Sequence, residues 1–128
     1  AITSVMAFLQ RTGVLAIMDT EFTLAKQNKE DLVSEFNSDQ KIVVYKYSVD
    51  KETEYSLVDY DDEQNGDAIR ITLIPMNAVR FQATLAEVYA ILSIKREGAV
   101  YIFSNTTDDI IGIISWETLS HYLHQASY

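Results

Sequence analysis

The sequence predicts an α/β protein made of two α-β-β-α copies packed with pseudo-twofold symmetry. Residues 84–123 follow the order helix, strand, strand, helix within about forty residues. A weaker version of this order precedes it at a nearly constant offset, since Val43 and Val100 are 57 positions apart and Val58 and Ile114 are 56 apart. With 128 residues in total, the two copies together can bury a core that neither could build alone.

The second copy is expected to contain a helix that begins at Leu85. Thr84 and Glu87 have the spacing of a capping box, in which a hydroxyl and a carboxylate satisfy N–H groups at the helix start. Apolar residues then recur at helical spacing on one face, at Leu85, Val88, Tyr89 and Leu92. Residues 95–98, which end in a glycine, are expected to terminate this helix.

Two apolar runs with many β-branched residues follow this helix. Residues 99–103 and 110–114 have the length and composition of buried strands, and the polar residues 104–109 between them indicate a turn. Ser115 is then placed to cap a last helix, whose apolar face carries Trp116, Leu119 and Leu123.

The first copy matches the helix–strand–strand–helix order less closely than the second. Its expected elements are a short helix within residues 29–37, strands at 41–49 and 54–60, and an acidic linker at 59–67. Residues 69–74 are expected to form the strand that opens the second copy, so the chain divides into a first copy, 1–68, and a second copy, 69–128. Before the first copy, the pattern predicts an amphipathic helix that ends near Gly13, then strands at 14–18 and 22–24.

Three segments carry a resemblance to a known family. They are Thr84-Leu85-Ala86-Glu87, then Gly98-Ala99-Val100-Tyr101-Ile102, and then Ile111-Gly112-Ile113-Ile114-Ser115 followed by Leu119. Together they resemble the second domain of a tandem cystathionine-β-synthase-type (CBS) pair. The family pattern has Gly, then Ser or Thr three residues on, then Asp six residues on. Gly112 and Ser115 match this pattern, whereas Thr118 stands where the family has Asp.

The resemblance implies a site for an adenine nucleotide (AMP, ADP or ATP) in the second copy. Ser115 would face the ribose or phosphate, Thr118 would make a weakened hydroxyl contact, and the residues around the base would be Val79, Ala99, Val100 and Tyr101. Tyr101 could stack on the base or fill the pocket with its own ring. Because a threonine cannot accept from two ribose hydroxyls as a carboxylate can, dimerisation without sensing is a competing hypothesis.

The first copy has different residues at the equivalent positions. Ser56 replaces the Gly, Asp59 replaces the Ser or Thr, and Asp62 stands where the family has Asp. A carboxylate at Asp59 would repel a phosphate at close range, so we expect a solvated acidic loop here and no phosphate ligand.

A narrower resemblance concerns the order of residues 55–60, 73–77 and the helix after Thr84. This order is similar to the C-terminal CBS pair of bacterial CLC chloride channels and chloride/proton antiporters. It implies a cytoplasmic, non-catalytic regulatory and dimerising module, forming homodimers and attached to a transmembrane transport domain at the inner membrane. The start at Ala1, without an initiator Met, fits an excised part of a longer protein.

Composition limits the other partners. The net charge of −9 disfavours nucleic acid and anionic membrane surfaces, and the mean hydropathy of −0.03 disfavours membrane insertion by these residues. The absence of cysteine excludes thiolate catalysis and thiolate metal sites. No nucleophile elbow or glycine-rich phosphate loop occurs, so we expect no catalytic residues and no enzymatic activity.

Two groups of residues imitate metal sites. His121, His124 and Glu117 could share a helix face, and residues 61–66 imitate the start of a calcium loop whose twelfth position is Thr72 and not Glu. Solvated surface is the preferred interpretation of both, so no metal site is expected. The alternative function left open is a free-standing small-molecule or divalent-metal sensor with an acidic first copy, in which Asp59, Asp61 and Asp62 would bind the ion.

Overall fold

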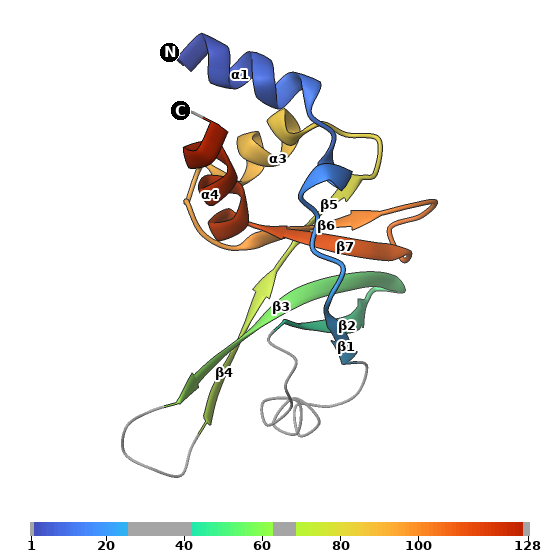
Figure 1. Ribbon diagram of the computed structural model, residues 1–128. Helices are drawn as coiled ribbons and strands as arrows, with labels where there is room; N and C mark the ends of the chain where they lie inside the picture. Colours follow the sequence, from blue (N-terminus) through green and yellow to red (C-terminus); the bar gives the residue numbers. More distant parts are fainter. Residues whose placement is uncertain (1, 26–41, 63–68, 127–128) are drawn as a thin grey trace. The chain divides into compact units, whose positions relative to one another are not determined.

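The computed structural model describes residues 2–25, 42–62 and 69–126. Its contacts divide the chain into two compact units (Figure 1). Unit 1 comprises Ala1–Thr20 and Asn77–Tyr128, and unit 2 comprises Glu21–Met76. Each unit is described by itself. The helix predicted within residues 29–37 lies outside the described residues.

Unit 1 is a three-stranded sheet with helices on one face (Figure 1). The strand order is β5-β6-β7, with β5 parallel to β6 and β6 antiparallel to β7. Its elements in chain order are α1 (Ile2–Arg11), the 3₁₀ turn η1 (Val14–Ala16), β5 (Asn77–Arg80), α3 (Leu85–Leu92), β6 (Ala99–Phe103), β7 (Ile110–Ser115) and α4 (Trp116–Ala126). The predicted helix–strand–strand–helix order of residues 84–123 is therefore confirmed.

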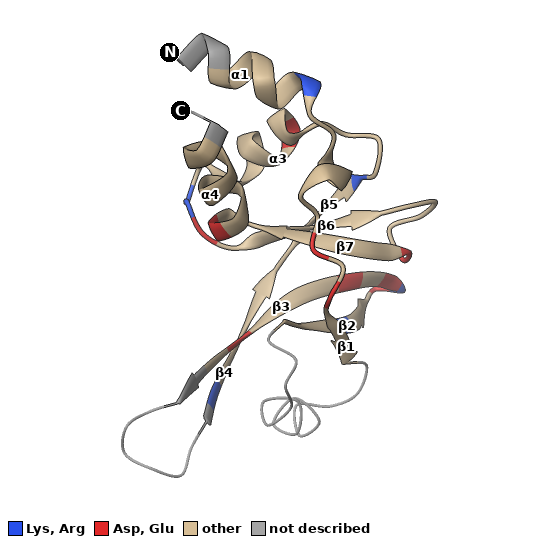
Figure 2. Ribbon diagram, in the orientation of Figure 1, with Lys and Arg blue, Asp and Glu red and all other residues tan. Residues whose placement is uncertain are grey.

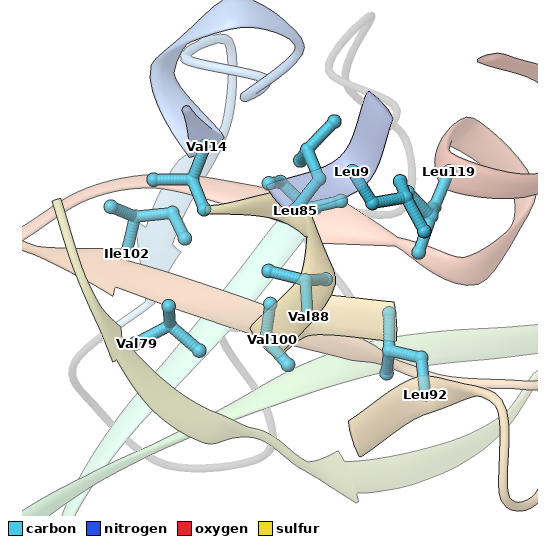
Figure 3. Close-up of a cluster of buried hydrophobic side chains, with 10 residues drawn as sticks. Leu9, Val14, Val79, Leu85, Val88, Leu92, Val100, Ile102 and Leu119 are labelled. Carbon is cyan, nitrogen blue, oxygen red and sulfur yellow. The ribbon is translucent and has the colours of Figure 1, made fainter. Parts of the chain in front are cut away.

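The core of unit 1 lies between this sheet and its helices (Figure 3). Side chains alternate along β6, so Val100 and Ile102 share the face that packs on the helices, and both are fully buried. The apolar face of α3 covers them. The buried members of the cluster are Leu9, Val14, Val79, Leu85, Val88, Leu92, Val100, Ile102, Ile114 and Leu119.

The N-terminal segment belongs to unit 1, although more than fifty residues separate it from β5 in sequence. The α1 helix packs on α3, and the Leu85 N–H donates to the Thr12 carbonyl oxygen at 2.8 Å. Further along, Asp19 and Ile113 exchange two backbone hydrogen bonds, of 2.8 and 2.9 Å. These hydrogen bonds hold residues 12–14 beside residues 83–85 and Asp19 beside β7, and we call residues 12–19 the edge segment.

The strand predicted at residues 14–18 is wrong. Val14 begins the turn η1, and only Asp19 pairs with β7. Within the apolar run, Val14 is buried and Leu15 is 52% exposed. The predicted helix before Gly13 and the predicted strand near residues 22–24 are confirmed as α1 and as β1 (Thr23–Ala25).

The start of α3 was predicted correctly, but its capping box was not. Thr84 is the N-cap residue in extended conformation, yet its side chain makes no capping hydrogen bond. The Glu87 N–H donates instead to the Thr84 backbone carbonyl, at 3.1 Å. Because the edge segment supplies the Thr12 carbonyl to the Leu85 N–H, a tertiary contact satisfies part of this helix start.

Unit 2 is a four-stranded sheet in the order β1-β2-β3-β4. β1 is parallel to β2 (Val43–Val49), which is antiparallel to β3 (Glu52–Asp62), and β3 is antiparallel to β4 (Ile69–Pro75). Asp50 and Lys51 join β2 to β3 with φ angles of 50° and 70°, as a tight hairpin turn requires. A small buried cluster of Ala25, Val43 and Val58 packs on one face.

Two predictions about the junction between the copies are wrong. Asp59 to Asp62 belong to β3 and not to a linker, and the strand from Ile69 pairs with β3 and does not open the second copy. The physical reason is the alternation of Val58 and Tyr60, which pack inward, with an exposed Asp59. Asn77–Arg80 opens the second sheet instead. These strand pairings do not test whether the sequence repeat itself divides into copies 1–68 and 69–128, so that division stays a prediction.

Candidate functional site

The predicted ligand contacts Ser115 and Thr118 come together at the start of α4. Ser115 is the residue before the helix, and its Oγ accepts a hydrogen bond from the Thr118 N–H at 3.2 Å. The Ser115 hydroxyl donates to Thr118 Oγ1 at 3.1 Å. This is the N-cap geometry that the sequence predicts, extended by a second bond between the two hydroxyls.

The hydroxyl pair suits a neutral polar group better than a phosphate. Beyond these two bonds, Ser115 Oγ has one lone pair left to accept a hydrogen bond, and the Thr118 hydroxyl can still donate its proton. The helix start offers fewer N–H groups than usual, because Trp116 N–H donates to the Gly98 carbonyl at 2.9 Å. Glu117, exposed in the same turn, adds a negative charge that would oppose an anion.

The other predicted lining residues lie on two different faces of the sheet. Ala99 pairs directly with Ser115 in the β6–β7 register, so it is close to the hydroxyl pair. Val79 and Val100 are part of the core under the helices, with 1% and no exposure. Alternation along β6 directs Tyr101 to the face opposite Val100. The structure therefore brings Ala99, Ser115 and Thr118 together, while Val79 and Val100 serve the core.

Tyr101 is a buried anchor for the loop between β6 and β7. The residue is 4% exposed, and its hydroxyl donates to the Thr107 carbonyl oxygen at 3.1 Å. The same loop is closed by a Ser104 N–H bond to the Asp109 carbonyl at 3.1 Å. This structural role of Tyr101 was not foreseen, because nothing local in the sequence links residue 101 to residue 107.

Gly112, the first residue of the family pattern, is closely packed against the edge segment. A Cβ at this position would overlap with Cγ and Sδ of Met18 and would lie 3.1 Å from the Asp19 carbonyl oxygen. The edge segment therefore approaches β7 as closely as a glycine allows. Met18 is the partner that sequence reasoning missed, since the contact is between residues nearly a hundred positions apart.

The equivalent positions of the first copy have other roles. Ser56 is 1% exposed, and its hydroxyl donates to the Tyr47 hydroxyl at 3.2 Å, which itself donates to Glu54 Oε2 at 3.3 Å. Asp59 is exposed on β3. The side chain of Asp62 lies outside the described residues. Ser56 is therefore a satisfied buried hydroxyl within the sheet.

No group of three or more acidic, histidine or cysteine residues close enough to hold a metal occurs within residues 2–25, 42–62 and 69–126. His121 Nε2 lies 3.1 Å from Gln125 Nε2, one turn along α4. The calcium-loop imitation continues into residues 63–66, which are outside the described part.

Basic residues are scattered over the described elements and do not gather into a stripe (Figure 2). Within that part of the chain, no helix is long and apolar enough to cross a membrane.

A cavity of about 780 Å³ opens at the other end of the same sheet. Its walls include Arg80 and Phe103, the last residues of β5 and β6. Ala99 pairs with Ser115 at the opposite end of β6, about 13 Å away along the strand. The cavity is therefore distinct from the Ser115–Thr118 pair.

Replacing Ser115 by Ala is expected to lower the free energy of unfolding of unit 1 by about 1 kcal/mol, because the N-cap acceptor for the Thr118 N–H is lost. Ser115→Asp retains a capping acceptor and is expected to stay near the wild type. Urea unfolding followed by the fluorescence of Trp116, the single tryptophan, measures both. Equal losses in the two variants would contradict the capping role.

The sequence matches no protein-family model and no curated protein. Among solved structures, the chain is similar to the CBS domain of a bacterial CNNM/CorC family Mg²⁺ transporter, in complex with the inhibitor IGN95a. The TM-score is 0.61 at 13% sequence identity, and the match covers 95% of this chain and 82% of that one. At this identity the likeness concerns the fold alone. It shows that this chain has the mixed α/β fold of a CBS domain.

Proposed function

We propose that this chain is a non-catalytic regulatory module of a membrane transport protein, and that its second copy binds an adenine nucleotide at Ser115 and Thr118. The observation that carries the proposal is the hydrogen-bonded hydroxyl pair at the start of α4, beside Ala99 of β6. It lies in the segment where the sequence resembles the CBS family. The fold supports the same interpretation, because the similar solved structure is a domain of a transporter.

The chemistry of the pair favours the ribose end of a nucleotide. The Thr118 hydroxyl can donate to a ribose oxygen, and the free lone pair of Ser115 can accept from a ribose hydroxyl. Phosphate charge is disfavoured by Glu117 in the same turn and by the net charge of −9. We therefore expect affinity to fall in the order AMP, ADP, ATP, and adenosine to bind at least as well as AMP.

Thermal unfolding with adenosine, AMP, ADP and ATP tests this site. A ligand at one hundred times its Kd stabilises the folded state by about 2.7 kcal/mol, which shifts the melting temperature by several degrees. Ser115→Ala is expected to reduce the shift. Thr118→Asp is expected to increase it, because a carboxylate can accept from both ribose hydroxyls.

A flat response to all four ligands, in the wild type and in Thr118→Asp, would contradict nucleotide binding. It would leave the competing hypothesis of a scaffold that dimerises without sensing.

The host proposed from the sequence is a CLC-type chloride channel or chloride/proton antiporter, with this module cytoplasmic and forming homodimers. The similar solved structure raises a CNNM/CorC-type magnesium transporter as a second host. The sequence of any membrane domain attached to this module would discriminate between these two hosts, since the two classes of transporter differ in that domain. Analytical ultracentrifugation of the isolated chain tests the homodimer, and a monomer at high concentration would contradict it.

A further inference from the structure

We propose that the cavity at the carboxyl ends of β5 and β6 binds a zwitterionic α-amino acid with a polar side chain. Its walls come from the end of β5, the first turn of α3 and the loop between β6 and β7. All of them belong to unit 1. The proposal is independent of the nucleotide site, because the cavity lies at the other end of the sheet.

The cavity is a wide depression open to solvent, and its size and position suit a small ligand. Its volume of about 780 Å³ falls in the range of small-molecule sites in proteins. Because β5 and β6 are parallel and Arg80 pairs with Phe103, both strands end at the same wall.

The walls are held in place by hydrogen bonds that do not depend on a ligand. The Phe81 N–H donates to the Phe103 carbonyl at 3.0 Å, and the Ala83 N–H donates to the Arg80 carbonyl at 3.0 Å. On the other side, Tyr101 fixes Thr107 through its buried hydroxyl. A largely preformed site loses less conformational entropy when a ligand binds.

Two opposite charges define the chemical class of the ligand. Arg80 and Glu87 both line the cavity and are exposed, and neither side chain forms a hydrogen bond or ion pair with another described residue. A guanidinium binds a carboxylate through two parallel hydrogen bonds, and a carboxylate accepts from an ammonium. A ligand carrying both groups satisfies both residues, whereas a simple anion would leave Glu87 facing a like charge.

The remaining wall selects the side chain of the ligand. Ser104, Asn105 and Thr107 contribute hydroxyl and amide groups, and Phe103 contributes the apolar surface. Such a wall can exchange hydrogen bonds with a hydroxyl or a carboxamide. We therefore expect L-serine, L-asparagine or L-glutamine to bind more tightly than L-leucine, which cannot use these groups.

Isothermal titration calorimetry of the whole chain with these four amino acids tests the proposal. For the amino acid that binds best, the N-acetylated and the amidated forms, which each lack one charge, are expected to bind at least about tenfold more weakly. Arg80→Gln and Glu87→Gln are each expected to weaken binding by a similar factor. The matched controls Arg96→Gln and Glu97→Gln, beyond the other end of α3, are expected to leave binding unchanged.

Two results would overturn the proposal. One is the absence of saturable binding of L-serine, L-asparagine and L-glutamine at roughly 10 mM, a concentration at which a Kd of 1 mM gives near saturation. The other is binding that depends on the carboxylate alone. In that case the N-acetylated form binds as tightly as the free amino acid, and Glu87→Gln has no effect. Ser115→Ala is expected to leave amino-acid binding unchanged, so the outcome is separate from that of the nucleotide test.

Discussion

Replacing Leu9 by Ala is expected to lower the free energy of unfolding of unit 1 by about 2–5 kcal/mol, the range for a leucine truncated in a packed core. Leu9 lies on α1, has no exposed surface and belongs to the same buried cluster as Leu85 and Leu119 (Figure 3). Urea unfolding followed by Trp116 fluorescence reports on this unit, because the tryptophan lies at the start of α4.

The control for this experiment is the neighbouring residue on the same helix. Gln10 is exposed, so Gln10→Ala is expected to change stability by no more than about 0.5 kcal/mol. If the two variants unfolded at the same urea concentration, α1 would not contribute to the core of unit 1. The N-terminal helix would then have no energetic link to the second copy, contrary to its contacts.

The elements of the second copy could be predicted because their patterns are local. The apolar face of α3 repeats at helical spacing, and the runs at 99–103 and 110–114 are short, apolar and separated by a polar turn. The cap at Ser115 was also predictable, since both partners of its hydrogen bond lie within three residues. Local spacing contains all the information that these predictions need.

The junction between the copies was predicted poorly because acidic composition obscured an alternating pattern. Val58, Asp59 and Tyr60 alternate between inward and outward positions, as in a strand with one solvated face. The sequence interpretation gave weight to the number of carboxylates and predicted a linker. The period-two pattern was the better signal for a strand at these residues, and β3 continues to Asp62.

The proximity of three of the predicted site residues is confirmed, while their role in ligand binding stays a prediction. Ser115, Thr118 and Ala99 come together because the end of β7, the start of α4 and the start of β6 are neighbours in the register. Val79 and Val100 were assigned to the site from resemblance alone, and the pleat of the sheet directs them into the core instead. The cavity near Arg80 was not foreseen, because its walls come from three segments with no shared motif.

Replacing Gly112 by Ala is expected to destabilise unit 1 by about 1–3 kcal/mol, the usual cost of overpacking. Two effects oppose each other in this substitution. Alanine is better than glycine in a strand by about 0.5–1 kcal/mol, because glycine loses more backbone entropy on folding. The overlap with Met18 and the close Asp19 carbonyl are expected to outweigh that gain.

Gly13→Ala is the matched control, since a Cβ there would meet only the Ala83 carbonyl oxygen at 4.0 Å and the φ angle of −74° suits alanine. We expect it to be neutral or slightly stabilising, by less than about 1 kcal/mol. Combining Gly112→Ala with Met18→Ala is expected to recover part of the loss, with a coupling energy of about 0.5–3 kcal/mol in urea unfolding.

The double-mutant cycle also bears on function. If Met18→Ala relieves Gly112→Ala, the glycine of the family pattern is required here by the edge segment, whether or not a nucleotide binds at Ser115. Gly112 then carries no information about ligand binding, and the nucleotide proposal depends on the two hydroxyls alone. If the two substitutions are additive, Met18 does not limit the space at Gly112, and the contact across β7 is looser than the structure indicates.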